Sequence, residues 1–326
     1  MWARILGSAA GGGFPQWNCA CRHCAGARTG TLPVRARTQA SLAVSADRQR
    51  WYLVNATPDI GSQLARLGPA ASLSTVFTTG RSAVEVAVPH NGVRSAGRPP
   101  SQAARRSPIA AVLLTDAELD HATGLLSLRE GDGLAVYATA AVLRAAAPLL
   151  DLLAAYQPVE RRELTPGVDV PLDDVIAVRA VPTGSTKLPR YAAHLPPDPA
   201  GVVGYRFTAQ DSGRRLVYLP CVPALTAPLV AELAGARCAL VDGTCWTDDE
   251  MATVGKPDKT SRSMGHAPVT GPGGTLSTLA TLPTPRRVYT HLNNTNPLLV
   301  EDSPQRHAVE AAGVEVAHDG MEIEVP

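Results

Sequence analysis

The sequence has almost no net charge and no long apolar run. Its 30 Lys and Arg residues balance 29 Asp and Glu residues, which gives a formal net charge of +1, and no polybasic run stands out. A nucleic-acid partner is therefore not expected, nor is docking on an acidic membrane. No stretch approaches the roughly 18–20 consecutive apolar residues that cross a bilayer, so we expect no membrane insertion.

A secretory signal and a disulfide framework are also lacking. Residues 1–10 contain one basic residue and few apolar ones before a glycine run, whereas a secretory signal needs a longer apolar segment. Six cysteines in 326 residues are too few for a disulfide scaffold. These absences predict a cytoplasmic protein.

Glycine and proline are frequent without dominating the composition. The chain has 28 of each, about 17% together against a usual ~12%, which implies many loops but neither a disordered nor a fibrous protein. A length of 326 residues would allow about two domains of roughly 150 residues. Because no domain-separating linker occurs, we expect residues 1–326 to form a single domain.

Strands and helices alternate along the whole chain, which favours one layered α/β domain. Alternation and apolar runs predict strands at residues 3–6, 40–45, 50–55, 108–114, 134–138, 176–181, 204–208, 215–220, 238–242, 287–291 and 313–317. Apolar spacing and composition predict helices at residues 124–130, 140–156, 227–234, 275–282 and 306–313. Residues 78–107, rich in Arg, Gly, Ser and Pro, are predicted to be a loop insertion.

Three cysteines lie within six positions of one another near the N-terminus. Cys19, Cys21 and Cys24 have the spacing C-x-C-x-x-C, which lets the chain turn so that several thiolates bind one tetrahedral ion. We predict a metal loop at about residues 18–24, with free, partly buried thiols as the alternative. The remaining cysteines, Cys221, Cys238 and Cys245, have no such spacing and are predicted to be small buried hydrophobic residues.

A second cluster of ionisable residues follows the predicted strand at 108–114. Asp116, Glu118, Asp120 and His121 lie within six positions, and unpaired buried charges are too costly for all of them to be core residues. They form either a solvated turn or a polyvalent cation site. Further polar residues follow other strands: Asp59, Asp242, His266 and His291. Because strand ends meet at one edge of a layered α/β sheet, the cation site is favoured.

Several motifs together resemble a known family. The segments at residues 6–19, 114–121, 241–244, 264–266 and 291–297 are similar to those of the PqqB family of pyrroloquinoline quinone (PQQ) biosynthesis, within the metallo-β-lactamase superfamily. The resemblance extends to residues 319–323 and so covers nearly the whole chain. It implies the αββα sandwich of that superfamily, with metals at one edge of the two sheets.

The resemblance also implies ligands for the active-site metal. The superfamily signature T-H-x-H-x-D-H falls on residues 115–121, where Asp116 and Glu118 replace two histidines while Asp120 and His121 remain. By the same resemblance, Asp242 matches a bridging carboxylate and His291 the final histidine, whereas the strand at 177–182 is not followed by the usual histidine. A two-zinc hydrolase is therefore disfavoured.

Two histidines and a carboxylate are the donor set of mononuclear non-haem Fe(II) oxygenases. His121 and His291 with Asp120 or Asp242 would supply that set for Fe(II). His266 would be a further ligand or a proton donor, and Asp116 and Glu118 would handle protons beside it.

The implied activity is iron- and dioxygen-dependent hydroxylation of the tyrosine ring of a Glu-Tyr-derived PQQ precursor. The partners would be this small peptide-derived precursor, dioxygen and other PQQ biosynthesis proteins. Two alternatives remain: a zinc metallohydrolase in the same pathway, and a soluble carrier of PQQ or its precursor that aids export to the periplasm.

For the cysteine cluster, the resemblance extends to phosphodiesterase-like relatives in which such a motif and a downstream histidine bind structural zinc. That histidine would fall at Asn294. The fourth zinc ligand is therefore open between a side chain such as Asp319, the nearby His23, and water. We predict a structural Zn(II) that anchors the loop.

Overall fold

The computed structural model describes residues 1–67 and 107–325. The insertion predicted at about 78–107 lies outside these residues except for its last position. The strands are β1 (Trp2–Gly7), β2 (Ser41–Ser45), β3 (Trp51–Val54), β4 (Ile109–Leu113), β5 (Leu134–Ala138), β6 (Val159–Glu163), β7 (Asp169–Pro171), β8 (Ile176–Pro182), β9 (Val203–Ala209), β10 (Arg215–Leu219), β11 (Cys238–Asp242), β12 (Arg286–Thr290), β13 (Glu315–Val316) and β14 (Glu322–Glu324). The α-helices are α1 (Arg22–Thr29), α2 (Ile60–Ala65), α3 (Leu119–Ala122), α4 (Ala140–Ala145), α5 (Ala147–Ala154), α6 (Ala227–Ala234), α7 (Leu276–Thr281) and α8 (Pro304–Ala311).

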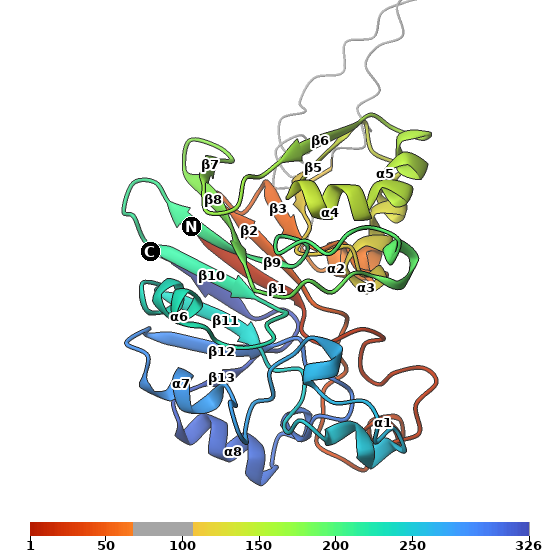
Figure 1. Ribbon diagram of the computed structural model, residues 1–326, viewed down its shortest axis with the longest axis vertical. Helices are drawn as coiled ribbons and strands as arrows, with labels where there is room; N and C mark the ends of the chain where they lie inside the picture. Colours follow the sequence, from red (N-terminus) through yellow and green to blue (C-terminus); the bar gives the residue numbers. More distant parts are fainter. Residues whose placement is uncertain (68–106, 326) are drawn as a thin grey trace, which may run out of the picture.

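The strands form two seven-stranded sheets: the first combines β1–β6 with the last strand, β14, and the second contains β7–β13 (Figure 1). The first has the order β14-β1-β2-β3-β4-β5-β6 and the second the order β13-β12-β11-β10-β9-β8-β7. In the first sheet β3, β4, β5 and β6 are parallel, and in the second β10, β11, β12 and β13 are parallel. The parallel strands bring the loops after β10, β11 and β12 to one edge of the second sheet.

The main core lies between the two sheets. Side chains alternate across each strand, so Ile5, Leu42 and Leu113 of the first sheet are buried in one cluster with Tyr205, Leu216 and Leu240 of the second. Tyr205 also reaches across the interface, where its hydroxyl donates to the Leu114 carbonyl at 2.6 Å. The strand ends of both sheets are thereby fixed relative to each other.

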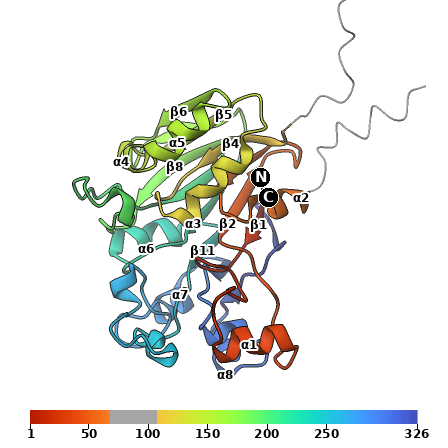
Figure 2. The same cartoon turned by 90° about the vertical axis from the view of Figure 1, so that its right-hand side faces the viewer.

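Helices cover the outer face of each sheet. Ile60 of α2, Val142 of α4 and Leu150 of α5 pack on the outer face of the first sheet, and Leu229 of α6, Leu279 of α7 and Val309 of α8 pack on that of the second. Figures 1 and 2 show these helices on opposite sides of the molecule. The predicted αββα sandwich is confirmed.

Two helices predicted from the sequence differ from those in the structure. The helix predicted at 124–130 is a 3₁₀ helix at Thr123–Leu128, where Gly124 packs so closely on the loop after β3 that its N–H donates to the Ala56 carbonyl at 2.9 Å. The helix predicted at 140–156 is divided into α4 and α5 at Ala146. Pro148 explains the break, because proline lacks the N–H that would continue the helical hydrogen bonds.

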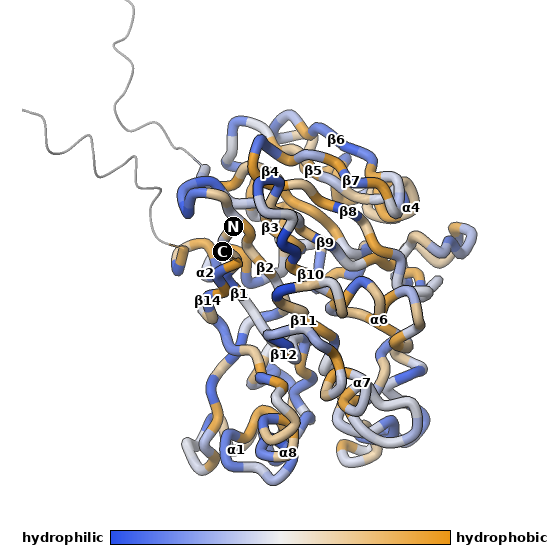
Figure 3. Tube along the Cα trace, turned by 90° about the vertical axis from the view of Figure 1, so that its left-hand side faces the viewer, coloured by the Kyte–Doolittle hydropathy of each residue, from blue (hydrophilic) through white to orange (hydrophobic). Residues whose placement is uncertain are grey.

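Several elements were not predicted from the sequence: α1, α2, β6, β7 and β14. β6 is an edge strand with the sequence Val-Glu-Arg-Arg-Glu, mostly exposed, and Figure 3 shows it as hydrophilic. Charged edge strands lack the apolar alternation by which strands are recognised. No helix in the described ranges has the length and apolar character needed to span a membrane.

Candidate metal centres

The loop after β4 holds His121 in place. Asn55, with a left-handed backbone (φ 65°), accepts a hydrogen bond from the Thr115 N–H at 3.0 Å. Asp116 accepts the Nδ1–H of His121 at 2.8 Å, the Thr115 hydroxyl at 2.8 Å and the Glu118 N–H at 2.9 Å. With its oxygens so occupied and the residue only 3% exposed, Asp116 orients the His121 ring.

A similar arrangement lies at the ends of β11 and β12. Fully buried Asp242 accepts the Nδ1–H of His266 at 2.7 Å and the Val222 N–H at 2.9 Å with one oxygen. Its other oxygen accepts the Thr244 N–H at 3.0 Å and the Thr244 hydroxyl at 2.6 Å. Because that hydroxyl donates to Asp242, it accepts the Nδ1–H of His291 at 2.8 Å. His291 has a left-handed backbone (φ 59°), which costs on the order of 1–3 kcal/mol and is typical of functional sites.

The three histidines converge with their Nε2 atoms available. The ring of His291 lies 5.4 Å from that of His121 and 5.1 Å from that of His266, centroid to centroid. The Nε2 atoms of His121 and His291 are buried and have no hydrogen-bond partner among the described residues. Histidines that bind metals commonly have one ring nitrogen held by a carboxylate or hydroxyl and the other free. This donor set fits a metal ion.

The described residues form two overlapping groups of candidate ligands at this edge. One group is His121, Cys221 and His291, and the other is Asp242, His266 and His291; the ligand atoms in each group lie within 4.8 Å of one another. Asp120 is adjacent, with one carboxylate oxygen 3.9 Å from His121 Nε2. Of the predicted ligands, the structure therefore brings His121, His291, Asp242 and Asp120 to one place, with His266 beside them.

The surroundings of the site shift the pKa values of His121 and His291 in opposite directions. Burial opposes a charge on His121, but the Asp116 and Asp120 carboxylates outweigh it and raise the pKa of His121 to about 9. Burial, together with the His266 and His121 rings, lowers the pKa of His291 to about 4. Burial raises the pKa of Asp242, but His266 and Thr244 outweigh this effect and keep it below its usual range. His291 is thus a neutral donor at pH 7, whereas His121 must release a proton when a cation binds.

Two hollows adjoin these histidines. One of about 160 Å³ is lined by Asp116, Glu118, Asp120, His121, Ser185, Lys187, Val202, Cys221, Met264, Gly265, His266 and His291. The other, of about 820 Å³, shares several of these residues and adds the exposed cations Arg190 and Lys259. Glu118 lines both and forms an ion pair with Lys187 at 3.4 Å. Asp59 lines neither hollow: its carboxylate accepts the N–H and side-chain amide of Gln39 at 2.9 and 3.0 Å.

The sequence-based prediction for Cys221 was wrong. Cys238 and Cys245 are buried in the fold as predicted, but Cys221 is only partly buried and lines the small hollow with His121 and His291. The available signal was its position: it comes two residues after β10, at the strand end next to Asp242.

The three clustered cysteines form a second candidate centre. Cys19 and Cys21 precede α1 and Cys24 lies in its first turn, so the predicted metal loop runs into a helix. Their sulfur atoms lie within 4.8 Å of one another. The side-chain amide of Asn294 reaches all three sulfurs, at 3.1, 3.6 and 3.4 Å. Asn294 thus lies where a fourth ligand would be.

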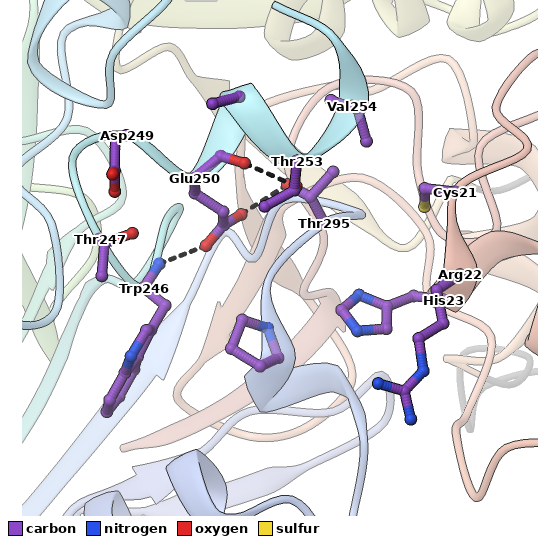
Figure 4. A pocket seen from close by; sticks show the side chains of 12 residues that line it. Cys21, Arg22, His23, Trp246, Thr247, Asp249, Glu250, Thr253, Val254 and Thr295 are labelled. Atoms are coloured by element: carbon purple, nitrogen blue, oxygen red, sulfur yellow. Dashed lines mark hydrogen bonds between the residues drawn. The ribbon is translucent and has the colours of Figure 1, made fainter. Parts of the chain in front are cut away.

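Neither side chain proposed as the fourth ligand joins this group. The predicted alternative Asp319 was wrong, because its carboxylate accepts hydrogen bonds from the backbone and hydroxyl groups of Ser8 and Thr38. His23 also stays outside the group that the structure describes. It lines a cavity of about 390 Å³ beside Cys21 (Figure 4).

Glu250 lies across this cavity from Cys21 and His23 (Figure 4). Its carboxylate accepts the Trp246 N–H and the Thr295 hydroxyl. Burial raises the pKa of Glu250 to about 7.

Known proteins resemble this chain over its whole length. The family model for the beta-lactamase superfamily domain matches residues 50–292. Coenzyme PQQ synthesis protein B of Azoarcus sp. (strain BH72) is 43% identical, over 98% of this chain and 99% of the relative. That of Pseudomonas fluorescens (strain SBW25) is 40% identical over 100% of both chains. The chain belongs to the PqqB family.

A solved structure agrees with this assignment to the PqqB family. The crystal structure of Zn²⁺-bound PqqB from Methylobacterium extorquens is 38% identical, with a TM-score of 0.82 over 99% of this chain and 100% of that one. The family resemblance predicted from the sequence motifs is confirmed. The fold and the family are therefore established over nearly the whole chain.

Proposed function

We propose that this protein acts in PQQ biosynthesis as a metal-dependent enzyme that hydroxylates the tyrosine ring of a Glu-Tyr-derived precursor, with Fe(II) and dioxygen. The observation that carries the proposal is the pair of buried histidines, His121 and His291, whose Nε2 atoms have no partner in the described part of the chain. The membership of this chain in the PqqB family supports the pathway.

The residues available to hold the metal are His121 and His291, with Asp120 or Asp242 as the carboxylate. A bound Fe(II) would supply the redox chemistry that dioxygen activation requires. In the hydroxylation, one oxygen atom of dioxygen replaces a ring hydrogen as a hydroxyl group and the other leaves as water, while an external reductant supplies two electrons and the solvent supplies two protons. Asp116 and Thr244 keep the two histidine rings in the tautomer that leaves Nε2 free.

The larger hollow suits an anionic substrate with an aromatic ring. Lys187, Arg190 and Lys259 line it, and a precursor made from glutamate and tyrosine carries carboxylates that these cations would bind. Leu119, unusually exposed for a leucine at 50%, and Met264 offer apolar contacts on the same wall. The ring would lie between these contacts and the histidines.

His266 is placed to move a proton at this hollow. Its Nδ1–H is held by Asp242 at 2.7 Å, so its Nε2 is the atom that exchanges a proton with substrate. Glu118, at the border of both hollows, is held by Lys187 at 3.4 Å and can accept the proton that a bound phenol releases.

The test is a single turnover with the protein loaded with Fe(II) in the absence of oxygen and supplied with a two-electron reductant such as ascorbate. The cross-linked Glu-Tyr precursor is added, and the sample is then divided between anaerobic buffer and buffer equilibrated with ¹⁸O₂. We expect hydroxylated product only with oxygen, carrying one ¹⁸O atom by mass spectrometry. His121→Ala should lose this activity, whereas His194→Ala, which changes an exposed histidine, should retain it.

Three outcomes would contradict the proposal. Hydroxylated product in the anaerobic sample would exclude the oxygenase. Cleavage of the precursor by protein loaded with two zinc ions would favour the hydrolase, and tight binding of finished PQQ without any conversion of precursor would favour the carrier.

A further inference from the structure

Cys221 is the one cysteine in the described residues that lines the histidine-bordered hollow. Its position is fixed by its neighbours on both sides. Pro220 precedes it at the end of β10, and Val222 follows it with both backbone groups bonded: its N–H donates to Asp242 at 2.9 Å and its carbonyl accepts the Ala267 N–H at 2.6 Å. The thiol is thus held on the same frame as Asp242 and His266.

The sulfur lies at metal-binding distance from two other donors. Ligand atoms of His121, Cys221 and His291 are all within 4.8 Å of one another. Around a tetrahedral ion, with Zn–N near 2.0–2.1 Å and Zn–S near 2.3 Å, two ligand atoms lie roughly 3.3–3.8 Å apart. The three side chains would therefore need to move only slightly toward one another to bind one ion.

The two histidines provide independent evidence for a ligand at this point. Both are almost fully buried, at 2% and 3% exposure, and both have an Nε2 atom without a partner among the described residues. Burying two such nitrogens without partners costs about 1–3 kcal/mol each. An ion between them and the sulfur would satisfy both.

In the other candidate group, Asp242, His266 and His291, the carboxylate is already occupied by hydrogen bonds. Asp242 already accepts four hydrogen bonds, and one of them holds His266. His291 belongs to both groups, but its Nε2 atom can bind only one ion. The group with an unengaged sulfur is therefore the better site for that ion.

We infer that Cys221 is a thiolate ligand of the active-site metal, together with His121 and His291. This inference rests on the metal centre of the proposed function but not on its oxygen chemistry. A thiolate favours zinc, iron, cobalt or copper over magnesium or manganese, which prefer oxygen ligands. The centre of this chain would accordingly discriminate against Mg²⁺ and Mn²⁺.

The test uses Co²⁺ as the metal, because each thiolate bound to Co²⁺ contributes to a near-ultraviolet charge-transfer band. Fully loaded wild-type protein should show the band of four thiolates, three from the cysteine cluster and one from Cys221. Cys221→Ser should reduce the band to that of three thiolates and weaken Co²⁺ binding at the histidine site by roughly 10–100-fold or more. Cys238→Ala, which changes a cysteine in the main core, should leave both unchanged.

Cys221→Asp separates loss of a ligand from loss of folding. A carboxylate at this position should restore Co²⁺ affinity while the band stays at three thiolates. If Cys221→Ser has the same band and affinity as wild type, the inference is wrong. Hydroxylation that fails while the fourth thiolate is present would overturn only the proposed function, because the thiolate band and the Co²⁺ affinity decide this inference without any turnover.

Discussion

The cysteine centre and the histidine centre differ in how the chain assembles them. Cys19, Cys21 and Cys24 come from one turn of chain leading into α1, and among the described residues Asn294 is the distant side chain that donates hydrogen bonds to them. The histidine centre is built from loops after β4, β10, β11 and β12, which come from both sheets. The first centre depends on local spacing and the second on the whole sandwich, so changes to them should have different consequences.

Cys21→Ser should give the largest loss of stability. Cys21 is a ligand candidate, and its sulfur also accepts the Cys24 N–H at the start of α1. Metal binding at a structural zinc site is folding free energy, so we expect a loss of several kcal/mol, measured by thermal unfolding, together with loss of zinc from this centre by metal analysis. The histidine centre should keep its metal. Loss of turnover with unchanged zinc content and melting temperature would show that the cysteine centre is not structural.

Glu250→Gln should make the free energy of unfolding depend less on pH. Glu250 lines the cavity beside Cys21 of the cysteine centre. The pKa of Glu250 is raised to about 7 by burial, so between its unfolded pKa near 4.3 and about 7 the folded state binds more protons than the unfolded state. Its contribution to stability is therefore complete at low pH and is lost as the pH rises through 7, by about 3 kcal/mol. In the variant, urea unfolding at pH 5 and pH 8 should differ less than in wild type by about this amount. Equal differences in both proteins would contradict the assignment.

Asp116→Asn should weaken the histidine centre without unfolding the protein. An asparagine oxygen can still accept the His121 Nδ1–H but carries no charge, and its amide group opposes the Thr115 hydroxyl or the Glu118 N–H, which both now donate to Asp116. Loss of such an outer partner costs about 10–100-fold in metal affinity, measured by competition with a chelator. Asp132→Asn, at an exposed position, is the control. Unchanged affinity would mean that Asp116 does not orient His121.

The contrast between the centres also explains what the sequence could predict. Cysteine spacing and apolar alternation are local patterns, so the cysteine cluster and most strands were predicted from them, whereas the sandwich was predicted from the family resemblance. The position of Cys221 beside His121 and His291 was missed because it depends on β10 lying beside β11, which no spacing in the sequence reveals. The hydrogen bonds that occupy Asp116 and Asp242 depend on the same packing. β6 escaped prediction because its charged residues suit an edge and lack apolar alternation.

Gly11→Ala should have the smallest effect. The position concerns both centres, because Gly11 lies in the glycine run that leads to the cysteines and also beside Asp120 of the histidine centre. A Cβ at Gly11 would lie 2.8 Å from the Asp120 carboxylate, which would have to shift from its present place beside His121. Because the end of a flexible side chain can shift at little cost, the melting temperature should stay nearly constant while metal affinity at the histidine centre changes a few-fold. Gly61→Ala in α2, where a Cβ meets nothing within 4 Å, should instead raise stability by up to about 1 kcal/mol and leave metal affinity unchanged. If Gly11→Ala lowers stability but not affinity, the glycine serves the fold and not the position of Asp120.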